Sequence, residues 1–215
     1  MNKKQSQGDE ERAIETLQSQ GGDSFSREDG QPQPTHDNLE RAASEHDDDR
    51  FPAHVVLYQP EIPQNTGNIG RTCVAVGAKL WIVRPAGFQI SDSKLRRAGL
   101  DYWQHLQLGD AVNWEDLQRQ LPGRRQFFFS RFATRTIWDA DFAPGDVFVF
   151  GRETSGLPDT ILDPKDPCAL RLPMSSHVRS LNLATTVGIV MYEHQRQLRA
   201  AGHHVGSVED APRLQ

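Results

Sequence analysis

The sequence predicts an α/β fold in which a parallel β-sheet is covered by helices on both faces. Apolar runs of four or five residues, short enough for strands, alternate along the chain with longer segments whose apolar residues recur at helical spacing. Several of the short runs are apolar throughout, which is typical of strands buried on both faces of a parallel sheet. Ligands bind such sheets at the carboxyl ends of the strands, so we expect the functional site in the loops that follow them.

The first half of the predicted domain supplies two strands and three helices. The strands are 54–58 (HVVLY) and 80–83 (LWIV). The helix 65–77 carries its apolar residues on one face, and 113–121 has a similar pattern. Between them, 91–99 is predicted to be a short basic helix, with a serine or an aspartate at its start as the cap.

The second half supplies three strands and the last long helix. The strands are 126–129 (QFFF), 146–150 (DVFVF) and 170–172, and the helix covers 181–199. The loops that follow Phe129, Phe150 and Leu172 are therefore expected to converge at one edge of the sheet.

The first 50 residues differ in composition from the rest of the chain. They hold 13 acidic and 6 basic side chains and only eight apolar ones, so we expect 1–50 to be a disordered acidic leader and 51–215 to be the working domain. The acidity of the whole chain, net −5, therefore belongs to the leader. No apolar run is long enough to span a membrane, and the N-terminus lacks the pattern of a secretory signal.

Common nucleotide- and metal-binding signatures are absent from the sequence. No G-x-G-x-x-G follows the first strand, and Leu157 stands where a phosphate-binding loop through Gly151 and Gly156 requires lysine. The pair His203-His204 has no cysteine or carboxylate partner at ligand spacing, so we expect no metal site.

The first of three polar clusters precedes and enters the helix 65–77. Asn65 or Thr66 is predicted to cap this helix, and Arg71 projects from its second turn. One interpretation is a capped helix with an ordinary surface arginine. The other is a polar loop and a cation that face an anionic substrate.

The second and third clusters follow later strands. Gly151 and Gly156 bracket Glu153 directly behind a strand, which indicates either a plain turn or a close approach of a ligand to the backbone. The third cluster runs from the strand end at Leu172 to Ser180 and the helix start. There Ser180 can cap the helix, and a helix start can also present free N–H groups to a ligand.

Together, these clusters resemble one family. N-T-G-N-I-G-R at 65–71, F-G-R-E-T-S-G-L-P at 150–158 and L-P-M…R-S-L-N-L at 172–183 are similar to the three motifs of the SpoU-type branch of the SPOUT RNA methyltransferases. The segments 58–65 (YQPEIPQN) and 95–102 (LRRAGLDY) resemble the members that methylate the ribose of the tRNA wobble nucleotide. The resemblance covers residues 54–200.

The resemblance implies a fold, a cofactor and a reaction. The C-terminal part of the α/β domain would form a deep trefoil knot, an exception to the rule against knots. S-adenosylmethionine would donate a methyl group to a ribose 2′-hydroxyl without any metal. The residues that would line the cofactor pocket are Phe129, Gly151, Leu172, Met174, Ser180 and Leu181.

The resemblance also implies roles in catalysis. It assigns Arg71 to activation of the 2′-hydroxyl. A guanidinium is almost always charged, so an equally good interpretation is that Arg71 stabilises the developing alkoxide or holds the adjacent phosphate. Asn65, Glu153, Ser180 and Asn182 would then orient the arginine and the ribose.

The implied partners are a second copy of the chain and the anticodon stem-loop of tRNA, and the implied location is the cytoplasm. The apolar face of the last helix would either form the homodimer interface or pack within its own subunit; it comprises Leu183, Val187, Val190 and Met191. RNA contact is expected at Lys94, Arg96 and Arg97. Two other hypotheses are 2′-O-methylation at another tRNA or rRNA position, and a non-catalytic RNA-binding knot protein.

Overall fold

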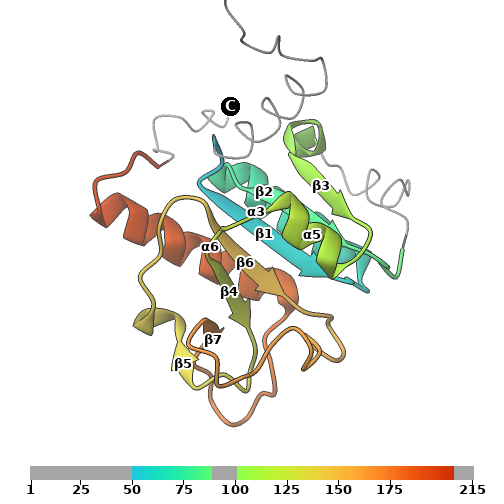
Figure 1. The fold of residues 1–215 in the computed structure, drawn as a ribbon. Helices are drawn as coiled ribbons and strands as arrows, with labels where there is room; N and C mark the ends of the chain where they lie inside the picture. The colour runs from blue at the N-terminus through green and yellow to red at the C-terminus, as the bar shows by residue number, and fades with distance from the viewer. Residues whose placement is uncertain (1–49, 89–100, 206–215) are drawn as a thin grey trace, which may run out of the picture. The chain divides into compact units, whose positions relative to one another are not determined.

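Seven parallel strands form one sheet in the order β3-β2-β1-β6-β4-β7-β5 (Figure 1). The computed structural model describes residues 50–88 and 101–205. The strands are β1 Ala53–Tyr58, β2 Lys79–Val83, β3 Leu108–Ala111, β4 Gln126–Phe129, β5 Arg135–Thr136, β6 Asp146–Phe150 and β7 Ala169–Arg171. Every pairing between neighbouring strands is parallel, which confirms the predicted parallel sheet.

Some predictions fall on residues that the structure does not describe. The predicted acidic leader lies outside the described residues except for Arg50. The predicted basic helix 91–99 also lies outside them, together with Lys94, Arg96 and Arg97.

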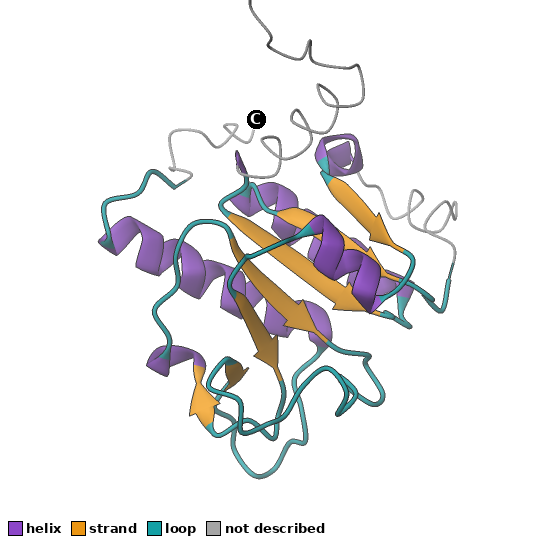
Figure 2. Ribbon diagram, in the orientation of Figure 1, coloured by secondary structure: helices purple, strands orange, loops and turns teal. Residues whose placement is uncertain are grey.

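Helices cover the sheet on both faces (Figure 2). The helices α3 Pro63–Val76 and α6 Leu183–Ala200 pack against one face, and α5 Trp114–Gln120 packs against the other. Short 3₁₀ helices, η3 Asp101–His105 and η4 Ile137–Asp139, lie in the connections. In the described part of the chain, no helix combines the length and hydropathy that crossing a bilayer requires.

Side chains that alternate along the central strands fill a layer of core on each face of the sheet. On β1, Val55 and Leu57 pack beneath α3 and α6, whereas Val56 between them packs with Leu117 of α5. All three β1 residues are fully buried. Side chains of successive strand residues point to opposite faces, so a strand covered on both sides has an apolar residue at nearly every position.

The start of α3 corrects the predicted cap. The N-cap residue is Ile62, which has no capping side chain, and Pro63 follows at the first helical position. The fixed φ of proline suits that position, where no N–H is needed. Asn65 and Thr66 are instead buried inside the first turn of the helix. The prediction that one of them caps α3 was therefore wrong.

The start and the apolar face of α6 settle two alternatives. The cap is Asn182 rather than Ser180, because the Asn182 side chain accepts hydrogen bonds from the backbone N–H groups of Ala184 and Thr185. Val187, Val190 and Met191, three of the four proposed interface residues, are fully buried in the core of their own subunit. Leu183, the fourth, is half-buried and packs against the same core.

The strands β3 and β5 were not predicted from the sequence. Strand β3 is an edge strand of sequence LGDA, in which exposed and buried residues alternate, so it lacks an apolar run. Its Gly109 is required by packing, since a Cβ there would lie 2.3 Å from a ring carbon of Trp81. Strand β5 has only two residues, Arg135 and Thr136.

Candidate active site

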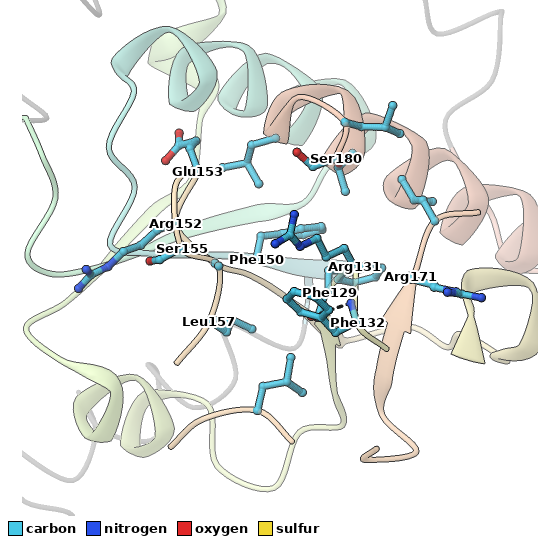
Figure 3. A pocket seen from close by; sticks show the side chains of 18 of the residues that line it. Phe129, Arg131, Phe132, Phe150, Arg152, Glu153, Ser155, Leu157, Arg171 and Ser180 are labelled. Carbon is cyan, nitrogen blue, oxygen red and sulfur yellow. Dashed lines mark hydrogen bonds between the residues drawn. The ribbon is translucent and has the colours of Figure 1, made fainter. Parts of the chain in front are cut away.

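A cavity of about 470 Å³ lies at the carboxyl ends of β4, β6 and β7 (Figure 3). Its walls come from the three loops that the sequence singled out, which follow Phe129, Phe150 and Leu172. The three loops therefore converge, as predicted. All six residues predicted to bind a cofactor line this cavity: Phe129, Gly151, Leu172, Met174, Ser180 and Leu181.

Aromatic rings form an apolar wall of the cavity. Phe129 and Phe150 end neighbouring strands and stack with ring centroids 4.6 Å apart and an interplanar angle of 12°. Leu170 and Leu172 are buried beside them in the same core. Both phenylalanines are nearly inaccessible to solvent, which makes this wall rigid and suited to the flat, apolar part of a ligand.

The loop after β6 has a tight hairpin shape that depends on two glycines. Arg152 and Gly156 exchange backbone hydrogen bonds of 3.1 and 3.0 Å, and Gly156 has a φ of +75°. A Cβ on Gly151 would lie 2.2 Å from the carbonyl carbon of Gly156 and 2.3 Å from the nitrogen of Leu157. No side chain fits at Gly151, so the strand end and the returning loop are in direct backbone contact.

Three polar side chains link the three sequence clusters at the cavity. Asn65 donates from Nδ2 to Oε1 of Glu153 at 3.1 Å. The Oδ1 of Asn65 accepts a hydrogen bond of 2.9 Å from Nδ2 of Asn182. All three residues line the cavity. The amide of Asn65 thus uses both of its ends to connect a carboxylate on one loop with the cap of α6 on another.

Glu153 also holds the backbone that leads into α3. Its carboxylate accepts hydrogen bonds from the backbone N–H groups of Glu61 at 2.9 Å and Ile62 at 3.3 Å. In return, the Glu61 carboxylate accepts from the backbone N–H and the hydroxyl of Thr154 at 3.0 and 2.9 Å. A carboxylate at a helix N-terminus is stabilised by the helix dipole. The two loops are therefore clamped together by reciprocal contacts.

Arg71 is not among the residues that line this cavity. It is exposed on α3, and its guanidinium carbon lies 4.8 Å from the ring centroid of Tyr102. The Tyr102 hydroxyl donates to the carbonyl oxygen of Gly67 at 2.7 Å, which holds the ring against the helix. Arg71 follows Asn65 by six residues, so at 100° per residue the two project from different sides of α3.

The neighbouring Gly70 has a clear packing role. A Cβ at this position would lie 3.1 Å from Leu106 and 3.2 Å from the ring of Trp103. The side chains of η3 and the turn after it thus occupy the space above α3 that a larger residue would fill.

The sequence identified the loop after β4 but none of its individual residues. Ser130, Arg131 and Phe132 line the cavity, and so does Arg152 of the next loop. In Figure 3, Arg131 lies between Phe129 and Ser180, whereas Arg152 and Arg171 extend away on opposite sides. Only their position just after a strand end could have identified Arg131 and Phe132 from the sequence.

The two cysteines take no part in the cavity. Cys73 is fully buried in the core, and burial raises the pKa of its thiol well above the ordinary range, so it is unreactive. Within residues 50–88 and 101–205, no three His, Cys, Asp or Glu side chains are grouped closely enough to hold a metal ion.

Comparison with known proteins identifies the family. The model of the SpoU rRNA Methylase family matches residues 52–192. The chain belongs to this family. It is 46% identical over 149 residues to the tRNA (cytidine(34)-2′-O)-methyltransferase of Methylovorus glucosotrophus, an alignment that covers 69% of this chain and 97% of the relative.

Solved structures of SpoU-type enzymes share the fold. One, described as “Structural insights into the 2-OH methylation of C/U34 on tRNA”, aligns with a TM-score of 0.65 at 46% identity and covers 69% of this chain and 97% of its own. The SpoU methyltransferase AviRb from Streptomyces viridochromogenes, in complex with the cofactor AdoMet, aligns with a TM-score of 0.60 at 24% identity. That alignment covers 68% of this chain and 60% of AviRb, and at such an identity it supports the fold alone.

Proposed function

We propose that this SpoU-family protein transfers a methyl group from S-adenosylmethionine to the ribose 2′-hydroxyl of the wobble nucleotide, position 34, of tRNA. The observation that carries the proposal is the hydrogen-bonded chain Glu153–Asn65–Asn182, which joins all three family motifs at one cavity. The relative from Methylovorus glucosotrophus, named for this reaction, aligns over nearly its whole length.

The cavity suits S-adenosylmethionine in size and in chemistry. Its volume of about 470 Å³ lies within the range of small-molecule sites, roughly 300–1,000 Å³. The stacked Phe129 and Phe150 offer an apolar wall for a flat base. Gly151 brings bare backbone to the cavity, and the hydrogen-bonded Glu153 carboxylate lies in the same lining. When bound, the cofactor supplies an electrophilic methyl group on a sulfonium.

The residues of the chain mainly hold and orient the reactants. The three loops form the walls of the cavity, and we assign Asn65, Glu153, Ser180 and Asn182 to orient the reactants there. With the cofactor bound, the 2′-oxygen would bond to the methyl carbon while the bond from that carbon to the sulfonium sulfur breaks. The sulfur would keep the electron pair and leave as S-adenosylhomocysteine, and the hydroxyl proton would pass to solvent or a nearby base. We assign Arg71 to stabilise the negative charge that develops on that oxygen or to hold the neighbouring phosphate.

We propose that the enzyme works as a homodimer. Arg71 is exposed and lies outside the cavity lining, so in this arrangement it would act in the cavity of a second copy. The outer face of α6 exposes Ile189 (41%) and Tyr192 (62%), and α6 packs beside α3, the helix that carries Arg71.

Mixing an Arg71→Ala chain with a Gly151→Ala chain should restore activity that neither has alone. Failure of the mixture, with dimers confirmed by sedimentation, would contradict this arrangement.

We further propose that the C-terminal segment forms a deep trefoil knot. The sheet order supports this, because β7 lies between β4 and β5, which both precede it in sequence. Single-molecule pulling from both ends of the domain should yield a contour length shorter than that of an unknotted chain.

The proposal extends to RNA contact and location. We assign contact with the anticodon stem-loop to Lys94, Arg96 and Arg97, and we place the enzyme in the cytoplasm with its tRNA substrate. No metal is assigned to the reaction.

The test is methyl transfer from labelled S-adenosylmethionine to tRNA, followed by mass spectrometry to locate the modified ribose. We expect Arg71→Ala to lower kcat by about 10²-fold or more while the cofactor Kd is unchanged, because the lost cation acts mainly on charge that develops in the transition state. Arg119→Ala is the matched control, because it removes another exposed arginine, on α5. Full activity of Arg71→Ala would refute the role of Arg71.

The same experiment separates the two other hypotheses. A methyl group mapped to a different nucleotide would indicate an enzyme of the same class with another target. Calorimetry that detects no binding of S-adenosylmethionine would indicate an RNA-binding protein without activity.

A further inference from the structure

We propose that Phe132 is a stacking platform for an unpaired nucleobase of the RNA substrate, at the edge of the cavity where methyl transfer occurs. This inference rests on the proposed function, because it assumes that RNA is the substrate at this cavity. Phe132 lines the cavity, yet the residue is 65% exposed. A large apolar ring that stays exposed beside a binding site indicates a surface for a partner.

The backbone that carries this ring is anchored on both sides. The N–H of Ser130 donates to the carbonyl oxygen of Leu170 at 3.0 Å, which ties the loop to β7. The N–H of Phe132 donates to Oγ of Ser130 at 3.2 Å, and the next residue, Ala133, is buried. The loop is therefore anchored on both sides of Phe132. A loop with an anchored backbone loses little backbone freedom on binding, which lowers the cost of contact with a ligand.

The charge around the ring suits an anionic polymer. The guanidinium carbon of Arg131 lies 4.5 Å from the centroid of the Phe132 ring. Arg152 and Arg171 also line the cavity, and two carboxylates, those of Glu153 and Asp159, line it as well. The Glu153 carboxylate is already engaged by three donors. Arginines near a phosphate-rich substrate supply attraction, while the aromatic face supplies a surface on which a base can stack.

The position of the ring favours an RNA base over the cofactor. The nearby Phe129 and Phe150 already form a stacked, buried wall, which is the apolar surface suited to an enclosed small molecule. Phe132 is instead largely exposed at the same cavity, where a base of an incoming single-stranded loop can reach it. Proteins that recognise RNA loops commonly stack splayed-out bases on aromatic side chains beside arginine.

The test measures tRNA binding and cofactor binding separately. The variants are Phe132→Ala, Phe132→Leu and Phe132→Tyr, with Trp138→Ala as the control, because Trp138 is 70% exposed and does not line the cavity. Equilibrium tRNA binding is measured with S-adenosylhomocysteine present, so that no turnover occurs, and calorimetry gives the Kd for S-adenosylmethionine. Thermal melting shows that each variant folds.

We expect Phe132→Ala and Phe132→Leu to raise the Kd for tRNA by about tenfold, the loss that one stacked base represents. Phe132→Tyr should stay within about twofold of the parent protein, and the cofactor Kd should be unchanged in all four variants. In turnover, KM for tRNA should rise more than kcat falls. Replacing single loop nucleotides with abasic ribose should then find one position at which Phe132→Ala causes no further loss.

Several results would overturn the inference. Unchanged tRNA affinity in Phe132→Ala would show that the ring makes no contact with RNA. Full affinity in Phe132→Leu would show an apolar contact without stacking, and weaker cofactor binding would assign the ring to the cofactor. Because binding is measured without turnover, a parent protein that binds tRNA but transfers no methyl group would count against the proposed function alone.

Discussion

The two ends of β6 carry similar polar chemistry but differ in what surrounds it. At the amino end, the Asp146 carboxylate accepts hydrogen bonds of 2.8 and 2.7 Å from Arg125 and one of 2.7 Å from the N–H of Ala143. At the carboxyl end, Glu153 accepts from the N–H groups of Glu61 and Ile62 and from the Asn65 side chain. Both carboxylates are well supplied with donors, but of the two only Glu153 lines the cavity at the carboxyl ends of the strands.

This comparison shows that satisfied polar networks do not by themselves mark a functional site. Asp146 is 3% exposed and lies outside the lining of that cavity. Around Glu153, glycines and strand ends leave space beside the network. Changes at the amino end should therefore alter stability alone, whereas changes at the carboxyl end should also alter ligand binding.

The largest effect on stability and ligand binding is expected from a side chain added at Gly151. In Gly151→Ala, the added methyl group would meet the backbone of Gly156 and Leu157, so the hairpin must move. We expect a loss of about 3 kcal/mol in the free energy of unfolding. We also expect at least about 100-fold weaker binding of S-adenosylmethionine, because the cavity wall is displaced. Calorimetry and denaturant unfolding measure the two effects.

Gly188→Ala is the matched control for that change. A Cβ at Gly188, in the middle of α6, meets no atom within 4 Å. Alanine should stabilise the helix by about 0.5–1 kcal/mol and leave cofactor binding as it was. Equal loss of binding in both variants would mean that the close contact at Gly151 is not what shapes the cavity.

Much of this carboxyl-end site could be predicted from the sequence. The apolar runs that end at Phe129 and Phe150 fix where the loops begin, and parallel strands bring those loops to one edge. The motifs around Gly151 and Asn182 could be identified because their residue types and spacing resemble one family.

The partners of individual side chains could not be predicted in this way. Asn65 bonds to residues 88 and 117 positions away in the sequence, and such pairs depend on the folded geometry. The N-cap of α3 is Ile62, which has no capping side chain, and Glu153 on a distant loop holds the backbone before the helix, so local capping rules pointed to the wrong residues. The place of Arg71 outside the cavity lining had no signal in the sequence either.

The second prediction tests the comparison by changing the carboxylate at each end of β6. Asp146→Asn breaks the doubly hydrogen-bonded ion pair between buried Asp146 and half-exposed Arg125, and it should cost about 2–3 kcal/mol of unfolding free energy. Glu153→Gln should cost less, about 1–2 kcal/mol, since an amide oxygen still accepts from the start of α3. Only Glu153→Gln should reduce methyl transfer at a temperature where both variants are folded. If Asp146→Asn lowers kcat/KM as much as Glu153→Gln does, the two ends of β6 do not differ in their effect on function.

The smallest effect concerns His194, which is fully buried near Asp146. Burial lowers the pKa of His194 below its ordinary value of 6.5, although the hydrogen bond with the Ala143 carbonyl and the charge of Asp146 oppose this shift. Below about pH 6.5 the unfolded chain then binds a proton that the folded chain does not. The free energy of unfolding should therefore be highest above that pH. It should decrease as the pH drops toward 5, by at most about 1.4 kcal/mol per pH unit. His194→Phe should flatten this part of the melting profile, because a ring between Phe142 and Phe148 without ionisable nitrogens binds no proton. The cofactor Kd should be the same in both proteins across this pH range. If His194→Phe keeps the full loss of stability in acid, groups other than His194 cause that loss.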